Sequence, residues 1–162
     1  MGRPATFDPK RFREVLGHLP TGVIVVTAET ISGPVGMAVN SFTSASLDPP
    51  LVLLCPAKSS TTWPEVRGAR RFCANFLAGD HEEVSRRFAG SDRDRFAGVG
   101  WQRTACGPRL DGVVAWLGCE IEEEHDAGDH TIAVARVLCL DGAATAPPLV
   151  FHRGGYAAIA AL

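Results

Sequence analysis

The chain has 162 residues, of which 46% are hydrophobic, and its 16 basic and 18 acidic side chains give a formal net charge of −2. This length suits one domain over residues 1–162, whose core buries about two-thirds of the surface that the unfolded chain exposes. Because the charges nearly cancel and Lys/Arg runs are missing, composition excludes nucleic acid and an anionic membrane as electrostatically favoured partners.

The five cysteines lie far apart and mostly in apolar runs, at Cys55, Cys73, Cys106, Cys119 and Cys139. Such spacing is typical of reduced thiols that pack as small hydrophobic side chains. The first residues lack a secretory-signal pattern, and no apolar stretch reaches the roughly 18 residues that span a bilayer. We therefore expect a cytoplasmic protein.

The N-terminal part is expected to form a helix followed by a β-hairpin. Asp8 can cap the helix, Pro9 suits its first turn, and apolar residues follow at helical spacing. The β-branched run 22–27 and the segment 34–40 predict two strands that pair as a hairpin. A buried strand is expected over residues 51–55.

Further helices and strands are expected in the middle of the chain. The pattern predicts a helix from Ser59 to about Val66, a strand over residues 71–77, and a helix capped by Asp80 that runs through Phe88. Residues 90–112 show little periodicity. That segment predicts a long functional loop or an excursion packed on a partner, with Trp101 exposed.

The C-terminal part is dominated by β-strand patterns. Two long strands, 113–123 and 130–140, flank the turn-rich residues 126–129, and a short strand over 149–152 precedes two glycines. About six strands with short helices predict a mainly β protein with short α-helices, most simply an antiparallel barrel.

Several familiar chemical motifs are missing from the sequence. The chain has no complete dinucleotide-binding or P-loop glycine pattern, no Cys-x-x-Cys, no His-Glu-x-x-His and no Gly-x-Ser-x-Gly. The acidic cluster in residues 120–126 is interpreted as a solvated face. We predict no metal site, and a nucleotide would bind without a Rossmann domain.

Small and hydroxyl side chains gather in residues 36–50, where a strand gives way to extended chain. Amides and hydroxyls there can hydrogen bond the polar edge of a flat ring such as isoalloxazine, while Met37 or Phe42 covers a face. The alternative is a Ser/Thr-rich edge strand and turn without a ligand.

The segment Lys58-Ser-Ser-Thr-Thr62 combines a cation, four hydroxyls and the start of the predicted helix. These features suit a phosphate. An ordinary helix-capping cluster is the alternative interpretation, because Ser and Thr are common N-caps.

Taken in order, these segments resemble the flavin reductase-like family over residues 8–156. The resemblance rests on residues 36–50, on the Lys58, Ser60 and Thr62 spacing, on the 71–77 strand, on Phe88-Ala89 with Asp94-Arg95-Phe96, and on the Gly128-Asp-His-Thr131 turn. It implies an FMN-binding split β-barrel, usually a homodimer, that reduces FMN or FAD with NADH or NADPH. Reduced flavin would then diffuse to a separate oxygenase, as in two-component monooxygenases.

The resemblance also implies roles for individual residues. The flavin ring would be lined by Met37, Ala38, Val39, Asn40 and Ser41, and Ser44 and Ser46 would lie near the ring or the ribityl chain. The phosphate would contact Lys58, Ser59, Ser60 and Thr62.

Two further regions complete the implied site. His130 would be the catalytic residue beside the nicotinamide and flavin; its alternative role is to cap the turn through Asp129. Arg153 and Tyr156 would approach the nicotinamide cofactor or the flavin, although His152 stands where the family usually has an aromatic residue.

Hydride transfer between two cofactors needs no protein nucleophile or metal, because the cofactors carry the electronic work and the protein positions them. One alternative function is a flavin-binding carrier, and another is a split-barrel oxidoreductase that uses a deazaflavin or oxidises pyridoxamine phosphate. A structural or interaction protein is the third. The Gly128–His130 turn and the Lys58 cluster favour the reductase.

Overall fold

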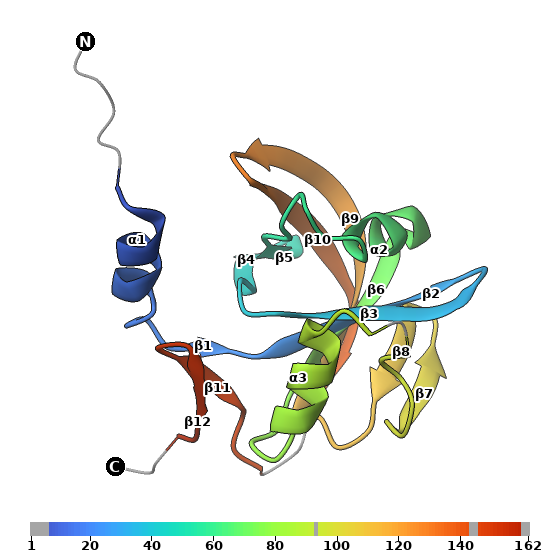
Figure 1. Ribbon diagram of the computed structural model, residues 1–162. Coiled ribbons are helices and arrows are strands. Elements are labelled where there is room, and N and C mark those ends of the chain that lie inside the picture. Colours follow the sequence, from blue (N-terminus) through green and yellow to red (C-terminus); the bar gives the residue numbers. More distant parts are fainter. Residues whose placement is uncertain (1–6, 93, 143–145, 160–162) are drawn as a thin grey trace.

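The computed structural model describes residues 7–92, 94–142 and 146–159. Its elements, shown in Figure 1, are α1 (Pro9–Leu16), β1 (Thr21–Gly22), β2 (Ile24–Thr30), β3 (Gly33–Val39), β4 (Thr43–Leu47), β5 (Pro50–Leu54), α2 (Trp63–Ala69), β6 (Arg71–Phe76), α3 (Glu82–Ala89), β7 (Trp101–Thr104), β8 (Gly107–Leu110), β9 (Ala115–Ala127), β10 (His130–Asp141), β11 (Val150–His152) and β12 (Gly155–Ala157). This mainly β content with short helices confirms the predicted fold class. Within the described ranges, none of the helices is long and apolar enough to cross a membrane.

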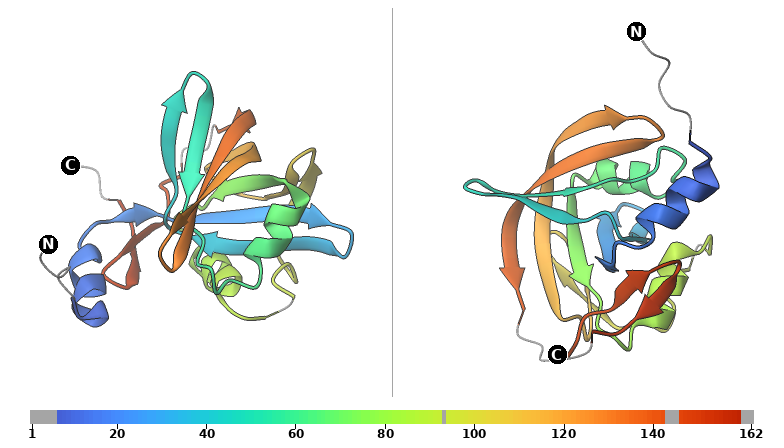
Figure 2. Two further views of the ribbon diagram at one scale, coloured as in Figure 1. Left: turned by 90° about the horizontal axis from the view of Figure 1, so that it is seen from above. Right: turned by 90° about the vertical axis from the view of Figure 1, so that its left-hand side faces the viewer.

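A strongly curved sheet of seven antiparallel strands forms the body of the protein, in the order β3-β2-β6-β9-β10-β5-β4 (Figures 1 and 2). The β2–β3 hairpin predicted from the sequence is present, with Ile24 opposite Val39. Strands β9 and β10 are the longest, and two irregularities in their register let them bend around the barrel. Strand β3 stands at one end of the order, so its outer edge is open to other groups.

Two hydrophobic clusters fill the space around this sheet. The larger one includes Phe72, with Trp63 and Val66 of α2 packed over it. The smaller one joins Phe88 of α3 to Leu77 at the end of β6. Helix α2 therefore covers the sheet mainly at β2, and α3 covers it mainly at β3.

An arm projects from the barrel in Figure 1 and consists of α1 with the small sheet β1-β11-β12. The arm is held by the Arg153 N–H, which donates to the Gly17 carbonyl at 2.8 Å. Asp8 caps α1 through the Lys10 N–H at 3.0 Å, as predicted. The apolar side chains of α1 stay exposed, however, and Phe12 and Leu16 are each 54% accessible.

The starts of two helices differ from the sequence prediction. Helix α2 begins at Trp63 rather than Ser59, because the preceding residues form a turn in which Ser60 N–H donates to Ala57 O and Ser60 Oγ accepts from Trp63 N. Asp80 is not the cap of α3. That helix starts at Glu82 after a turn in which His81 N–H donates to the Ala78 carbonyl.

The segment predicted as an irregular loop contains the hairpin β7–β8. Its turn is closed by Thr104, whose hydroxyl donates to Gly107 O at 2.7 Å and accepts from Cys106 N at 3.1 Å. Gly107 has a φ of +123°, which favours glycine. Trp101 is half-buried against Phe96 rather than exposed. The short strands β1, β4, β7, β8 and β12 are additional to those predicted from the sequence.

Candidate functional site

Two adjoining hollows follow the open edge of β3, and we call them together the β3 groove. The first, of about 280 Å³, is lined by Met37 and Ala38, by residues 59–62, by residues 88–91 and by Arg95. The second, of about 140 Å³, is lined by Val23, Ala38, Val39, Asn40, Ser85, Ala89, Phe151 and Tyr156. Because both share Ala38 and Ala89, the groove runs from a hydroxyl-rich end to an aromatic end.

Close packing of α3 on β3 shapes the middle of the groove. A Cβ atom at Gly36 would lie 2.7 Å from the Phe88 ring, so only glycine allows this approach. The structure thus brings four predicted ring-contact residues, Met37 to Asn40, to the groove. These residues present an open sheet edge, which can hydrogen bond a flat ligand.

The hydroxyl-rich end is formed by the turn before α2. Ser59, Ser60 and Thr62 line it, and the Ser60 hydroxyl lies 3.8 Å from the Met37 sulfur. Lys58, in contrast, does not line the groove. Its ammonium contacts the carboxylate of Asp126 and donates to the carbonyl of Gly128 at 2.6 Å.

Arg95 is a candidate site residue that the sequence prediction omitted. Its guanidinium donates to Gly36 O at 2.6 Å, to Thr62 Oγ1 at 2.8 Å and to Gly90 O at 2.6 Å. All three acceptors are neutral, and its Nε is buried without a hydrogen-bond partner among the residues that the structure describes. The hydroxyl-rich end therefore holds a positive charge with unused donor capacity, which suits a phosphate.

His130 lies on the β9–β10 turn, which packs against the start of the hydroxyl-rich segment. The turn is fixed by hydrogen bonds from Lys58 N to Asp129 O at 2.9 Å and from Thr131 N to Pro56 O at 3.0 Å. The imidazole Nδ1 lies 2.7 Å from the Asp129 carboxylate. Hydrogen bonding to His130 lowers the pKa of that carboxyl. His130 lines neither hollow, so its catalytic role stays a prediction.

Three predicted ring contacts are placed outside the groove. The Ser41 hydroxyl bridges to the backbone of Cys55, accepting from its N–H at 3.0 Å and donating to its carbonyl at 3.3 Å. Ser44 and Ser46 belong to β4 and line a different, apolar hollow of about 500 Å³, together with Leu47. Their predicted contact with flavin stays untested.

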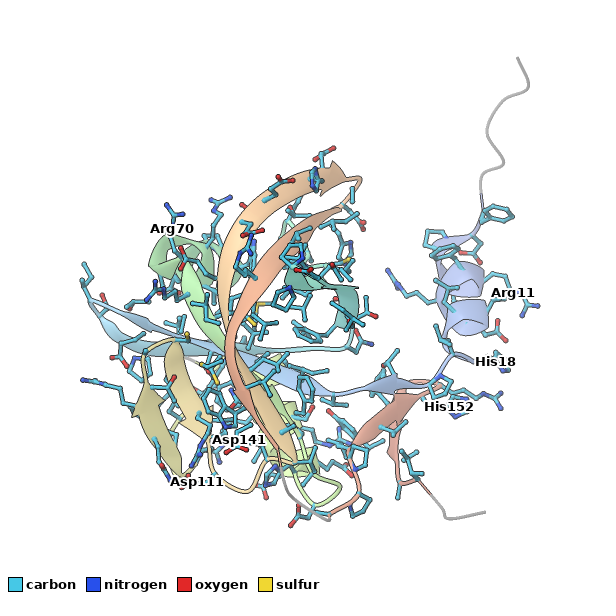
Figure 3. All side chains as sticks on the ribbon, turned by 180° about the vertical axis from the view of Figure 1, so that it is seen from behind. Arg11, His18, Arg70, Asp111, Asp141 and His152 are labelled. Atoms are coloured by element: carbon cyan, nitrogen blue, oxygen red, sulfur yellow. The ribbon has the colours of Figure 1, made fainter. Side chains whose placement is uncertain are left out.

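The aromatic end of the groove is built by Tyr156. Its hydroxyl lies 2.8 Å from Ser85 Oγ, and the Arg86 guanidinium lies 5.0 Å from its ring centroid. Arg153 is exposed in the β11–β12 turn and does not line the groove. Figure 3 shows His152 on the same arm, away from the curved β9–β10 pair.

The described residues form no group of three or more His, Cys, Asp or Glu side chains that could hold a metal ion. The groove joins a polar strand edge, hydroxyls beside a cation and an aromatic end, and this arrangement supports ligand binding. A phosphorylated, flat heteroaromatic ligand matches these three features.

Known proteins are similar to this chain over nearly its whole length. Residues 16–160 match the flavin reductase like domain. A flavin reductase of Pseudomonas putida is 44% identical over 160 residues, which cover 98% of this chain and 94% of that protein. The reductase subunit HsaB of a flavin-dependent monooxygenase from Rhodococcus jostii is 43% identical over 153 residues, covering 94% and 78%.

Solved structures of related oxidoreductases are also similar to this chain. Nitrilotriacetate monooxygenase component B from Mycobacterium thermoresistibile has a TM-score of 0.90 and 40% identity, covering 93% of this chain and 86% of that chain. The NADH:FAD oxidoreductase SgcE6 of Streptomyces globisporus, solved with NAD and FAD fragments, has a TM-score of 0.89 and 35% identity, covering 97% and 98%.

These comparisons confirm the split-barrel fold and the flavin reductase function predicted from the sequence. With a matching domain over residues 16–160 and relatives above 40% identity, the chain belongs to the flavin reductase-like family.

Proposed function

We propose that this protein takes a hydride from NADH onto an exchangeable flavin, and that reduced flavin leaves for a separate oxygenase. The β3 groove carries the proposal, because it joins an open strand edge to hydroxyls beside Arg95. A relative named FMN reductase (NADH), SmoA of Agrobacterium fabrum, supports NADH as the donor. NADPH remains the alternative donor.

The groove residues fit a flavin by chemical type. The end of β3 from Met37 to Val39, with Asn40 just after it, would hydrogen bond the polar edge of the ring, while Ser59, Ser60, Thr62 and Arg95 would hold the phosphate. A bound flavin supplies the hydride acceptor. The protein's part is to bind and orient, so this use of the groove requires no proton-transfer step by a groove residue.

His130, Lys58 and Arg153 are proposed to act at the margins of this groove. The 128–131 turn abuts the hydroxyl-rich segment through backbone hydrogen bonds, which supports a place for His130 beside the nicotinamide. Lys58 would add charge near the phosphate while it stays bonded to the turn. Arg153 and Tyr156 would contact the nicotinamide cofactor or the flavin from the arm.

We also propose that the protein is a homodimer, as the family resemblance implies. Exposed apolar residues of α1, including Val15 at 50% accessibility, support this assembly. So does the apolar hollow beside β4, where Leu47 is 91% accessible. Sedimentation equilibrium tests the proposal, and a monomer at micromolar concentration would contradict it. Ser44 and Ser46 line that hollow, so they are proposed to reach flavin only in the assembled protein.

A cytoplasmic location and a single domain over residues 1–162 remain part of the proposal. Five free cysteines support a reducing compartment, and the family match over residues 16–160 supports one domain.

The decisive assay follows NADH or NADPH absorbance after FMN, FAD or riboflavin is added in turn under air. Oxidation that depends on added flavin is the expected result, and the rates rank the donors and flavins. If flavin binds in a titration but neither donor is oxidised, the protein is a carrier or uses a deazaflavin. Flavin that stays bound through purification would also favour the carrier.

A further inference from the structure

Two cysteine sulfurs occupy the space beside Gly118 in β9. A Cβ atom at this position would lie 2.5 Å from the sulfur of Cys139 and 2.8 Å from the sulfur of Cys106. Both sulfurs therefore fill the volume that any larger residue at position 118 would take. They come from segments 33 residues apart in the sequence, so the fold rather than local sequence brings them together.

The two cysteines differ in their access to solvent. Cys106 lies in the β7–β8 turn and is 3% accessible, whereas Cys139 in β10 is exposed. A register irregularity between Val137 and Cys139 places Cys139 opposite Gly118. Such bulges redirect side chains. Here the bulge lets Cys139, rather than Leu138, pair with Gly118.

We propose that Cys106 and Cys139 are a peroxide-oxidised thiol pair that closes to a disulfide. The exposed Cys139 thiolate attacks hydrogen peroxide, forming an S–O bond and releasing water after protonation, which leaves a sulfenic acid. The Cys106 sulfur then attacks the Cys139 sulfur, the S–O bond breaks, and a second water leaves. Two thiols lose two hydrogens and two electrons, and one peroxide becomes two waters.

The protein's own activity supplies the oxidant. Reduced flavin released under air reacts with dioxygen and yields hydrogen peroxide, so peroxide forms where the reductase works. This source rests on the reductase function, whereas the pair itself rests on the geometry around Gly118 alone.

The neighbouring thiols are poorer candidates for the first step. Cys73 and Cys119 are fully buried, and burial raises the pKa of both thiols, that of Cys73 to about 12. Burial also raises the pKa of Cys106. Peroxide reaches an exposed sulfur more readily than a buried one, so Cys139 attacks first and Cys106 resolves.

The test exposes fully reduced protein to hydrogen peroxide and measures the intact mass, followed by a non-reducing tryptic map. We expect a loss of about 2 Da, the mass of two hydrogens, and a cross-link between peptides 104–109 and 137–153. The variants C106S and C139S should not lose this mass, and dimedone should trap a sulfenic acid on Cys139 in C106S. The matched control C55S removes a cysteine outside the cluster and should behave as wild type.

A second arm replaces added peroxide with NADH and FMN under air, with and without catalase. Disulfide formation that catalase abolishes identifies turnover as the oxidant source. If the protein oxidises no NADH but still cross-links with added peroxide, turnover is not the source of the oxidant, and the assignment of the Cys106–Cys139 pair still holds. A cross-link between other cysteines, a Cys139 bond between two copies, or over-oxidation of Cys139 without any cross-link in wild type would overturn the proposal.

Discussion

Replacing Arg95 with methionine tests whether the hydroxyl-rich end of the β3 groove binds the flavin phosphate. The change removes the guanidinium and its charge and keeps an unbranched apolar chain about as long as the arginine stem. A hydrogen bond to a charged group contributes about 1.5 to 3 kcal/mol, and each 1.4 kcal/mol is tenfold in affinity. FMN affinity should therefore fall roughly 10- to 100-fold. Riboflavin, which lacks the phosphate, should change little.

The ratio of FMN to riboflavin affinity is the quantity to measure, by titration of flavin fluorescence. Arg95 also donates to Gly36 O, Thr62 Oγ1 and Gly90 O, so its loss should destabilise the fold by about 2 to 4 kcal/mol. Both flavins bind the same weakened variant, and the ratio therefore separates the phosphate contact from the structural role.

Two further variants sharpen the interpretation. Arg95→Lys keeps the positive charge but loses the planar guanidinium that donates to three acceptors. It should retain part of the preference for FMN over riboflavin. Arg103→Met removes an exposed arginine that pairs with Glu29 at 3.2 Å in another part of the structure, and should leave both affinities unchanged. Equal losses of FMN and riboflavin affinity in Arg95→Met would refute the phosphate assignment.

Four other changes have defined outcomes. Lys58→Ala should weaken FMN more than riboflavin, yet less than Arg95→Met does, because the ammonium is shared with Asp126 and Gly128; unchanged FMN affinity would remove Lys58 from the site. His130→Ala should lower turnover with NADH more than flavin affinity, whereas equal effects in steady-state kinetics and titration would leave it a turn-capping residue. Asn75→Ala should lower the free energy of unfolding in urea by about 3 kcal/mol. The reason is that this buried amide donates to Val25 O at 3.1 Å and accepts from Leu110 N at 2.8 Å. A loss below about 1 kcal/mol would show that the groups around Asn75 rearrange to replace these hydrogen bonds. Mildly alkaline iodoacetamide should alkylate Cys139 and spare Cys73 in the folded protein, since burial raises the pKa of the Cys73 thiol to about 12; peptide mapping that finds both modified at one rate would contradict this burial.

The predictable parts of the fold were those with a strong local pattern. The β2–β3 hairpin and the long strands β9 and β10 have runs of β-branched and apolar residues, and Asp8-Pro9 marked the start of α1. The β7–β8 hairpin was missed because its strands are short and polar. Its turn depends on Thr104 and Gly107, a three-residue spacing that resembles an ordinary loop.

The helix starts were missed for a related reason. A run of Ser and Thr before α2 offers several possible caps, and the choice depends on a tertiary contact. Ser60 caps the turn while its hydroxyl approaches Met37 of β3, and Thr62 accepts from Arg95. Nothing in the local sequence ranks these hydroxyls, so the start of the helix is decided by the strand and loop that surround it.

Some site residues could be predicted from the local sequence, whereas others depend on tertiary contacts. Met37 to Asn40 reach the groove because it follows the open edge of β3 and the residue just after it, and the sequence pattern predicts that strand. Arg95 follows a segment without periodicity, and its position depends on α3 carrying residues 88–91 up to β3. Gly36 makes that approach possible, since a side chain there would collide with Phe88. The glycine within this strand therefore marks the place where α3 packs close to β3. Arg95, which the sequence prediction omitted, lies in the loop after α3 and donates to the carbonyl of Gly36.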